Sequence, residues 1–389
     1  MREGERLVVV GGGPAGLSTA RAYRDAGGRA ALTLLSAEEH PPYQRPPLTK
    51  EFLRGEQQRA DLWLEDEQWY VDNGVDLRLG TRAEGLDLHR GVVRAGSREH
   101  PFDACVLATG SRPKRPPFPG GDDPGLLTMR TLDDSERLRA SAGPQDAVVV
   151  IGAGFIGCEA AASLAMRGAA VTLVAPESVP LEPRLGQRAG ARLAGWLEEA
   201  GVVLRLEAQV ESISRVGPWE VALAGGERLR AAAVVAATGV APRMELTRAA
   251  GLHEEQGAVA VDARMRCGDE RVLAVGDVAA AQHASAGRRL RVEHWGDALV
   301  HGEVAGRTLA GEDAAWREPP GFWSTIGERT IKHAAWGDGH DEAIVEVDEP
   351  DRLVVRYRRG GAEVGVLAHN DDEAYEGSRD ALRAAGSGR

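Results

Sequence analysis

Short apolar runs alternate along the chain with glycine-rich turns and helical patterns. The first apolar run, Leu7–Val10, enters a turn at 11–13, an Ala-rich helical pattern follows, and a second apolar run covers Ala30–Leu35. The order strand, turn, helix, strand predicts the βαβ unit of a dinucleotide-binding domain. Just beyond the second strand, Glu38 is placed to accept hydrogen bonds from a ribose, although the adjacent Glu39 could do so instead.

The spacing of the glycines in this first turn supports a dinucleotide site. Gly11 permits a tight turn, Gly13 lets the backbone approach a pyrophosphate, and Gly16 lets the helix pack closely on the strand. Pro14 and Ala15 open the helix, and the free N–H groups of its N-terminus would face the phosphates.

The same order of elements returns in the second half of the chain. The apolar run Ala147–Ile151 enters a second glycine turn, and a helical pattern and the apolar run Ala170–Val174 follow. The glycines of this turn are Gly152, Gly154 and Gly157. Each half later contains an apolar strand that ends in Ala-Thr-Gly, at 108–110 and at 237–239. Two copies of one pattern in the same order predict an internal duplication with two nucleotide sites.

The last part of the chain has a different pattern. A break at 318–321, which contains two prolines, separates an Ala-rich helix at Ala298–Leu309 from segments in which apolar and polar residues alternate. This alternation predicts the strands of a small antiparallel sheet. The predicted strands are Ala343–Val347, Leu353–Tyr357 and Ala362–Leu367, followed by a terminal helix over 371–385. We therefore predict an α/β protein with two Rossmann-like nucleotide-binding domains and a small α+β C-terminal domain.

The composition is that of a globular protein with an acidic balance. The 389 residues are 43% hydrophobic, and 59 acidic against 47 basic side chains give a net charge of −12, which argues against nucleic acid as an obligatory partner. Because no apolar run is long enough to span a membrane and the N-terminus shows no cleavable signal, we expect a cytoplasmic protein without a membrane partner.

The spacing of cysteines and histidines argues against two kinds of site. Cys105, Cys158 and Cys267 form no closely spaced pair, so the sequence predicts no local redox dithiol and three buried thiols. The histidines show no paired metal-ligand spacing, so we expect no metal site.

A proline-rich loop after the first βαβ unit carries the most specific motif. Its sequence at 42–50 is Pro-Tyr-Gln-Arg-Pro-Pro-Leu-Thr-Lys, which predicts a stiff loop that holds Arg45 and Lys50 in place. Together with the glycine turn before it, this loop resembles the FAD-dependent NAD(P)H:ferredoxin reductase family. That family includes the reductase components of Rieske-type oxygenase systems, putidaredoxin reductase and rubredoxin reductase, with apoptosis-inducing factor as a distant relative.

The resemblance implies the FAD/NAD(P)-linked reductase fold and assigns the domains. Residues 1–115 and 242–318 would form a discontinuous FAD-binding domain, residues 116–241 an NAD(P)H-binding domain, and residues 319–389 the C-terminal domain. The first glycine turn is then expected to bind FAD and the second to bind the nicotinamide nucleotide.

Each nucleotide site has a set of expected contact residues. On the FAD side these are Gly11, Gly13, Pro14, Ala15, Gly16, Glu38, Arg45, Lys50, Ala108, Thr109, Gly110, Arg112, Gly276, Asp277, Trp295 and Trp323. On the NAD side these are Gly152, Gly154, Phe155, Ile156, Gly157, Glu159, Glu177, Thr238 and Gly239. By resemblance, Lys50 and Glu159 form an ion pair beside the flavin and Trp295 lies on the nicotinamide side, so these three are the predicted catalytic residues. Trp323 is expected to flank the flavin, and His294 could shape the same pocket.

The sequence alone leaves the choice between NADH and NADPH open. The strand at 170–174 is followed by Ala175-Pro176-Glu177, whereas an acidic residue directly at the strand end is expected for an NADH ribose. Glu177 could serve from its displaced position. Arg184 and Arg188 lie close enough in sequence to reach a 2′-phosphate. The pattern favours NADH and leaves NADPH possible.

Two nucleotide sites imply hydride transfer from the nicotinamide to FAD. Without a dithiol, electrons must leave from the flavin, and the resemblance favours transfer of single electrons to a transiently bound ferredoxin-type iron–sulfur protein that supplies an oxygenase. An NAD(P)H oxidase, a quinone or small-molecule reductase, and a redox-responsive NADH-binding flavoprotein like apoptosis-inducing factor are the alternatives. The chain has Thr325-Ile326-Gly327-Glu328 where family members commonly have an Asp-Gln pair, so the acceptor stays open, as does the choice between monomer and homodimer.

Overall fold

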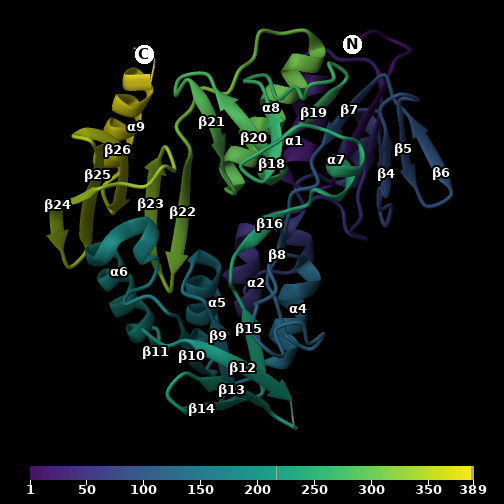
Figure 1. The fold of residues 1–389 in the computed structure, drawn as a ribbon. Coiled ribbons are helices and arrows are strands. Elements are labelled where there is room, and N and C mark those ends of the chain that lie inside the picture. The colour runs from purple at the N-terminus through teal and green to yellow at the C-terminus, as the bar shows by residue number, and fades with distance from the viewer. Residues whose placement is uncertain (216, 387–389) are drawn as a thin grey trace.

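The computed structural model describes residues 1–215 and 217–386. Three parts are visible in Figure 1: a first nucleotide-binding part built from the N-terminal and middle segments, a second one in teal, and a C-terminal sheet with its helix in yellow. The chain enters the second part after the first third of its length and then returns to the first part.

A five-stranded parallel sheet forms the centre of the first part, in the order β19-β7-β1-β2-β3. Its strands are β1 (Arg6–Val10), β2 (Ala31–Leu35), β3 (Val75–Arg78), β7 (Ala104–Leu107) and β19 (Val272–Ala274). Strand β19 comes from beyond the second part, so the return of the chain completes this sheet. The apolar runs become central strands because both faces of a parallel sheet are covered by other elements.

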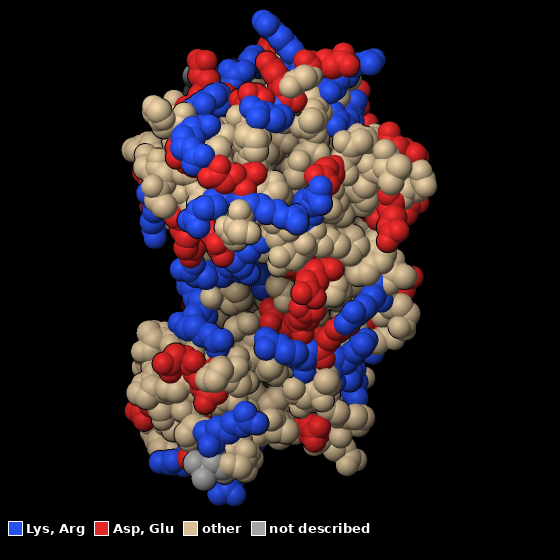
Figure 2. All heavy atoms as spheres, turned by 90° about the vertical axis from the view of Figure 1, so that its right-hand side faces the viewer, with Lys and Arg blue, Asp and Glu red and all other residues tan. Residues whose placement is uncertain are grey.

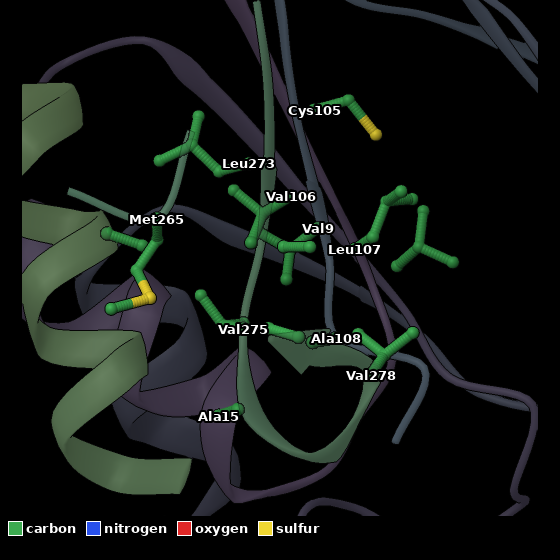
Figure 3. Close-up of a cluster of buried hydrophobic side chains, with 14 of the residues drawn as sticks. Val9, Ala15, Cys105, Val106, Leu107, Ala108, Met265, Leu273, Val275 and Val278 are labelled. Carbon is green, nitrogen blue, oxygen red and sulfur yellow. The ribbon is translucent and has the colours of Figure 1, made fainter. Parts of the chain in front are cut away.

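The core of this sheet joins residues that are distant in sequence. Val9, Val106 and Leu273 are neighbours on β1, β7 and β19, and all three are almost completely buried, as Figure 3 shows. Helix α1 (Pro14–Asp25) packs against α8 (Trp295–Ala310). Gly302 and Gly306 allow this contact because they have no Cβ atom. A Cβ on Gly302 would lie 2.4 Å from the Ala15 backbone oxygen, and one on Gly306 would lie 2.5 Å from the Thr19 backbone oxygen, both on α1.

Smaller elements surround the first sheet. Two further sheets have the orders β4-β5-β6 and β17-β18-β20-β21. Their strands are β4 (Gly85–Asp87), β5 (Val92–Ala95), β6 (Arg98–Pro101), β17 (Glu254–Glu255), β18 (Ala258–Val261), β20 (Ala279–His283) and β21 (Arg288–Arg291). The short helices are α2 (Glu51–Arg54), α3 (Glu67–Asp72) and α7 (Glu245–Ala249), with 3₁₀ turns η1 (Pro46–Thr49), η2 (Arg59–Leu62) and η3 (Gly276–Val278).

The second part repeats the βαβ arrangement around a parallel sheet in the order β11-β10-β9-β15. Its strands are β9 (Ala147–Ile151), β10 (Ala170–Val174), β11 (Val203–Arg205) and β15 (Ala233–Ala236). An antiparallel sheet of β12 (Val210–Arg215), β13 (Trp219–Leu223) and β14 (Arg228–Ala231) lies beside it. The helices are α4 (Leu132–Ser141), α5 (Phe155–Met166) and α6 (Glu182–Glu199).

Two short antiparallel strands mark the crossings between the two parts. Strand β8 (Ser111–Pro113) directly follows the first Ala-Thr-Gly segment, and β16 (Val240–Pro242) directly follows the second. The outgoing and returning chains therefore run side by side at the junction, near the middle of Figure 1. This pairing brings the ends of the two duplicated strands together.

The C-terminal part is a five-stranded antiparallel sheet in the order β22-β23-β26-β25-β24, with α9 (Asp372–Gly386) against it. The strands are β22 (Gly321–Ile326), β23 (Arg329–Ala335), β24 (Glu342–Glu349), β25 (Arg352–Arg359) and β26 (Ala362–His369). The three predicted strands are present, each longer than predicted. Strand β23 was not predicted, because its buried Ile331 and His333 alternate with Lys332 and give only a weak apolar pattern.

The distribution of charged, apolar and metal-binding side chains can be compared with the sequence predictions. Acidic and basic side chains are interspersed over the face drawn in Figure 2. No described helix is both long and apolar enough to cross a membrane. Within 1–215 and 217–386, no cluster of three His, Cys, Asp or Glu residues could hold a metal ion. The three cysteines are buried, as predicted, and burial raises the pKa of each thiol.

Candidate functional site

A cavity of about 570 Å³ lies where the three parts of the molecule meet. It receives residues from both glycine turns, both Ala-Thr-Gly segments, the proline-rich loop and strand β22. The predicted site residues that line it are Gly11, Gly13, Pro14, Ala15, Glu38, Arg45, Lys50, Ala108, Thr109, Gly110, Gly154, Phe155, Ile156, Glu159, Gly239, Gly276, Asp277, Trp295 and Trp323. The fold thus brings most of the two predicted sets to one place.

The first glycine turn shows why each glycine is needed. Gly11 has φ +125°, and a Cβ there would lie 2.1 Å from the backbone oxygen of Ala108. A Cβ on Gly16 would lie 2.0 Å from the Gly11 backbone oxygen. By contrast, no protein atom lies within 4 Å of the position that a Cβ on Gly13 would take. Two of these glycines are required by the protein's own packing, whereas the space beside Gly13 is open for a ligand.

The second turn repeats this arrangement. A Cβ on Gly152 would lie 2.5 Å from the Ala237 backbone oxygen, and one on Gly157 would lie 2.0 Å from the Gly152 oxygen. The Cβ position of Gly154 is again open. Gly13 and Gly154 are the residues that immediately precede α1 and α5, so both open spaces lie at a helix N-terminus, where a phosphate is stabilised by free N–H groups. The structure therefore has two places suited to the phosphates of a nucleotide, one at each glycine turn.

Glu38 is held in the cavity wall by the proline-rich loop. Tyr43 donates its hydroxyl to Glu38 Oε2 at 2.5 Å, and Arg45 donates to Oε1 at 2.7 Å. Burial alone would raise the pKa of Glu38, but the charge of Arg45 and the hydrogen bonds from Tyr43 and Arg45 outweigh it and lower that pKa below its usual value. Glu38 is thus kept ionised as an acceptor. Glu39, the other candidate, is exposed and does not line the cavity.

Asp277 is buried and fixed by two donors that the sequence did not indicate. The Ser111 hydroxyl donates to its Oδ2 atom at 2.6 Å, and Arg130 donates to the same oxygen at 2.8 Å. Ser111 lies on β8 and Arg130 just before α4, so neither is close to Asp277 in sequence. Only the remaining lone pairs of this carboxylate are available to a bound molecule.

Lys50 and Glu159 form a buried ion pair between the first and second parts. Lys50 Nζ lies 3.0 Å from Glu159 Oε2, and their side chains are 7% and 6% exposed. The predicted pair is therefore present in the fold, at the cavity wall. Glu159 also accepts a hydrogen bond from the Thr49 hydroxyl at 2.5 Å and one from the Ser324 hydroxyl at 2.8 Å.

Aromatic rings surround the side of the cavity near this pair. Phe155 and Phe322 pack edge to face with centroids 4.4 Å apart, and His294 lies 4.8 Å from Phe322. His294 Nδ1 also lies 2.9 Å from Asp297 Oδ2, which orients the imidazole at the start of α8. Trp323, at 45% exposure, stands at the rim. Phe322 was not predicted as a site residue, since a lone aromatic is usually part of a core.

Some predicted contact residues do not line the cavity. The Arg112 guanidinium pairs with Glu245 at the surface, and the Thr238 hydroxyl donates to the Lys114 backbone oxygen at 3.2 Å. Glu177 lies outside the lining as well. The remaining three are the glycines that pack behind the turns, namely Gly16, Gly152 and Gly157. For Arg112, Thr238 and Glu177, the local sequence could not determine where their side chains point.

Comparison with known proteins identifies the class. The family model of the pyridine nucleotide-disulphide oxidoreductases matches residues 5–302. The rubredoxin-NAD(+) reductase of Pseudomonas putida is 31% identical over 371 residues, which cover 94% of this chain and 93% of that protein. The ferredoxin–NAD(+) reductase component of the biphenyl dioxygenase system of Paraburkholderia xenovorans is 33% identical over 346 residues, with 88% and 84% covered. The crystal structure of the covalent putidaredoxin reductase–putidaredoxin complex matches with a TM-score of 0.93 and 29% identity, covering 99% of this chain and 94% of that chain.

The chain belongs to the pyridine nucleotide-disulphide oxidoreductase family and is an oxidoreductase. Within that family, its relatives are named as NAD(+) reductases of rubredoxins and of ferredoxins in dioxygenase systems. These findings confirm the predicted fold class and the resemblance to ferredoxin reductases. The exact domain bounds and the roles of the site residues stay predictions.

Arginines gather in the lining of the cavity, and not all of them have an ionic partner among the described residues. Arg82, Arg130 and Arg243 all belong to this lining. Arg130 pairs with Asp277, whereas no carboxylate among the described residues forms a salt bridge with Arg82 or Arg243. Arg82 is exposed and Arg243 is half-buried, so Arg243 is the less solvated of the two. Burial lowers the pKa of Arg243 below its usual value, and the charges of Arg82 and Arg130 lower it further. An anionic group in the cavity would relieve this repulsion.

We expect Arg243→Ala to weaken the binding of FAD by about tenfold, because a hydrogen bond to a charged group is lost. Titration of the apoprotein with FAD, followed by flavin fluorescence, measures the change. Arg248→Ala is the control, since Arg248 is exposed and pairs with Glu254 away from the cavity. Equal FAD affinities in the two variants would contradict this role for Arg243.

Proposed function

We propose that this protein takes hydride from NADH onto FAD and passes single electrons to a ferredoxin-type iron–sulfur protein that supplies an oxygenase. The observation that carries this proposal is the buried Lys50–Glu159 pair, which lies in the wall of a cavity that both glycine turns reach. A cofactor ring at this place would meet a fixed positive charge, which favours the gain of negative charge on reduction.

Different residues along the cavity would contact different parts of the two nucleotides. Gly13 and Gly154 leave room for the phosphates of two dinucleotides, and Glu38 offers a carboxylate to a ribose. Asp277, held by Ser111 and Arg130, would accept a hydroxyl of the FAD chain. Bound FAD supplies the conversion between two-electron and one-electron transfer. The task of the protein is to orient the two nucleotides and to keep water from the ring contact.

The position of the cysteines supports direct exit of electrons from the flavin. None of the three lines the described part of the cavity, and burial raises the pKa of each thiol, so reactive thiolates are disfavoured. Although the family name refers to disulphides, no cysteine of the described residues lines the cavity, so none is placed to relay electrons beside the nucleotides. An external one-electron acceptor fits this arrangement.

NADH is the proposed coenzyme. The Glu177 carboxylate lies near the start of α5. The pKa of Cys158, on that helix, is raised first by burial, then by the charge of Glu159 and then by the charge of Glu177. A carboxylate beside the second turn would repel a 2′-phosphate. Arg188, one candidate for binding that phosphate, is paired with Asp348, and Arg184 lies over the Phe155 ring at 5.8 Å.

Anaerobic stopped-flow mixing with NADH or NADPH, followed by reoxidation with a panel of ferredoxins, tests the proposal. We expect NADH to reduce the flavin faster than NADPH does, and rapid cytochrome c reduction only when a ferredoxin is added. Rapid oxygen consumption without a protein acceptor would instead indicate an oxidase. A long-lived complex with NADH that dimerises and turns over negligibly would indicate a redox-responsive binding protein. If neither nucleotide reduces the flavin, the proposal fails.

A further inference from the structure

Strand β22 places two neighbouring residues on opposite sides of the C-terminal sheet. Trp323 is 45% exposed at the rim of the cavity, whereas Ser324 is 1% exposed. The Ser324 hydroxyl reaches out of its own sheet and donates to Glu159 Oε1 at 2.8 Å. The backbone N–H of Thr325 points to the same oxygen at 3.3 Å. A side chain of the C-terminal part thus contacts the buried ion pair directly.

The two oxygens of Glu159 have separate sets of donors. Oε2 accepts from Lys50 and Thr49, which belong to the proline-rich loop of the first part. Oε1 accepts from Ser324 and Thr325 of β22. Glu159 itself is on α5 of the second part, so all three parts of the molecule meet at this carboxylate. A carboxylate removed from water needs such donors, because an unpaired buried charge is strongly unfavourable.

We propose that Ser324 is a positioning residue that holds the Glu159 carboxylate in the orientation that aims Lys50 at the cavity. This inference rests on the proposed role of Lys50 beside FAD. The Ser324 hydroxyl is the shorter of the two bonds to Oε1 and the only one from a side chain. Through this hydroxyl, the C-terminal part influences the electrostatic environment of the cofactor ring by way of Glu159 and Lys50.

Loss of this hydroxyl would leave Oε1 with the longer bond from the Thr325 backbone. The carboxylate is then free to rotate towards Lys50 and Thr49, and it draws the ammonium group away from the cavity. The positive potential at the ring falls, so reduction becomes less favourable. The fold is not expected to change, since β22 keeps its backbone pairing with β23.

The experiment compares Ser324→Ala, Ser324→Thr and Thr330→Val in the FAD-loaded protein. Thr330 is the control because its hydroxyl bonds Thr325 within the same sheet and has no contact with Glu159. The midpoint potential of the flavin is measured by titration with dithionite and indicator dyes, which needs neither NADH nor a ferredoxin. The rate of flavin reduction at saturating NADH is measured in parallel.

We expect Ser324→Ala to move the midpoint potential to a more negative value and to slow flavin reduction by about tenfold, a loss corresponding to one hydrogen bond to a charged group. Ser324→Thr should restore both values, and Thr330→Val should match the unmodified protein. An unchanged potential in Ser324→Ala, or an equal shift in Thr330→Val, would overturn the proposal. Failure of NADH to reduce the unmodified protein would instead contradict the proposed function, while the dithionite titration would still test Ser324.

Discussion

Gly13→Ala is expected to weaken FAD binding by about tenfold to a hundredfold and to leave NADH binding intact, whereas Gly154→Ala should do the reverse. In each case the new methyl group would occupy the open space at a helix N-terminus, where the phosphates of the bound nucleotide are proposed to lie. FAD affinity is measured by fluorescence titration of the apoprotein, and NADH affinity by titration of the FAD-loaded protein. Each variant is the matched control for the other.

Protein stability distinguishes this effect from simple misfolding. Both glycines have backbone angles that alanine can adopt, so the apoprotein should lose no more than about 1 kcal/mol of unfolding free energy in either variant. Gly16→Ala should instead destabilise the apoprotein strongly, because its Cβ would lie 2.0 Å from the Gly11 oxygen. Loss of both nucleotides in Gly13→Ala would argue against separate sites at the two turns.

Lys50→Met is expected to slow flavin reduction by NADH by about a hundredfold, since a fixed charge at the developing negative charge is removed. The same change should lower the free energy of unfolding by about 3 kcal/mol, because Glu159 loses its buried ionic partner. This value is at the low end of the usual cost of removing one partner of a buried ion pair, because Thr49 and Ser324 still donate hydrogen bonds to the carboxylate. Stopped-flow absorbance and urea unfolding measure the two effects.

Lys332→Met is the control for this substitution. Lys332 also forms an ion pair, with Asp372, but both side chains are substantially exposed, at 39% and 74%. Exposed pairs contribute little, so its removal should change stability by less than about 1 kcal/mol and leave flavin reduction unaltered. If Lys50→Met behaves like this control, the buried pair has no role in the reaction.

The local sequence predicted the elements that depend on neighbouring residues. Apolar runs of four to six residues followed by spaced glycines identified β1 and β9 and the helices after them, because turn geometry and burial are encoded within a short window. The proline-rich loop at 42–50 predicted the family, which the comparisons confirmed. Strand β23 escaped prediction because its burial comes from the strands on either side of it and not from its own polarity pattern.

Side-chain partners across the fold could not be predicted in the same way. Ser111 and Arg130 are far from Asp277 in sequence. Their residue types alone do not indicate a bond to Asp277, because the contact forms only when the tertiary structure brings the segments together. Arg112 illustrates the opposite case. The family resemblance implied a cofactor contact for it, and in the fold the return of the chain at α7 places Glu245 beside its guanidinium.

By itself the sequence determined the two glycine turns, the duplicated order of strands and the lack of closely spaced cysteines, because each depends on residue type and short-range spacing. The Lys50–Glu159 pair was predicted from the family resemblance. Only the tertiary structure decided which groups surround the Glu159 carboxylate and which arginines of the cavity are paired with a carboxylate. Those contacts join the first part, the second part and strand β22, so they arise only when all three have folded against one another. The charges of Lys50 and Glu159 follow from their residue types, whereas the orientation of the Glu159 carboxylate depends on the whole fold.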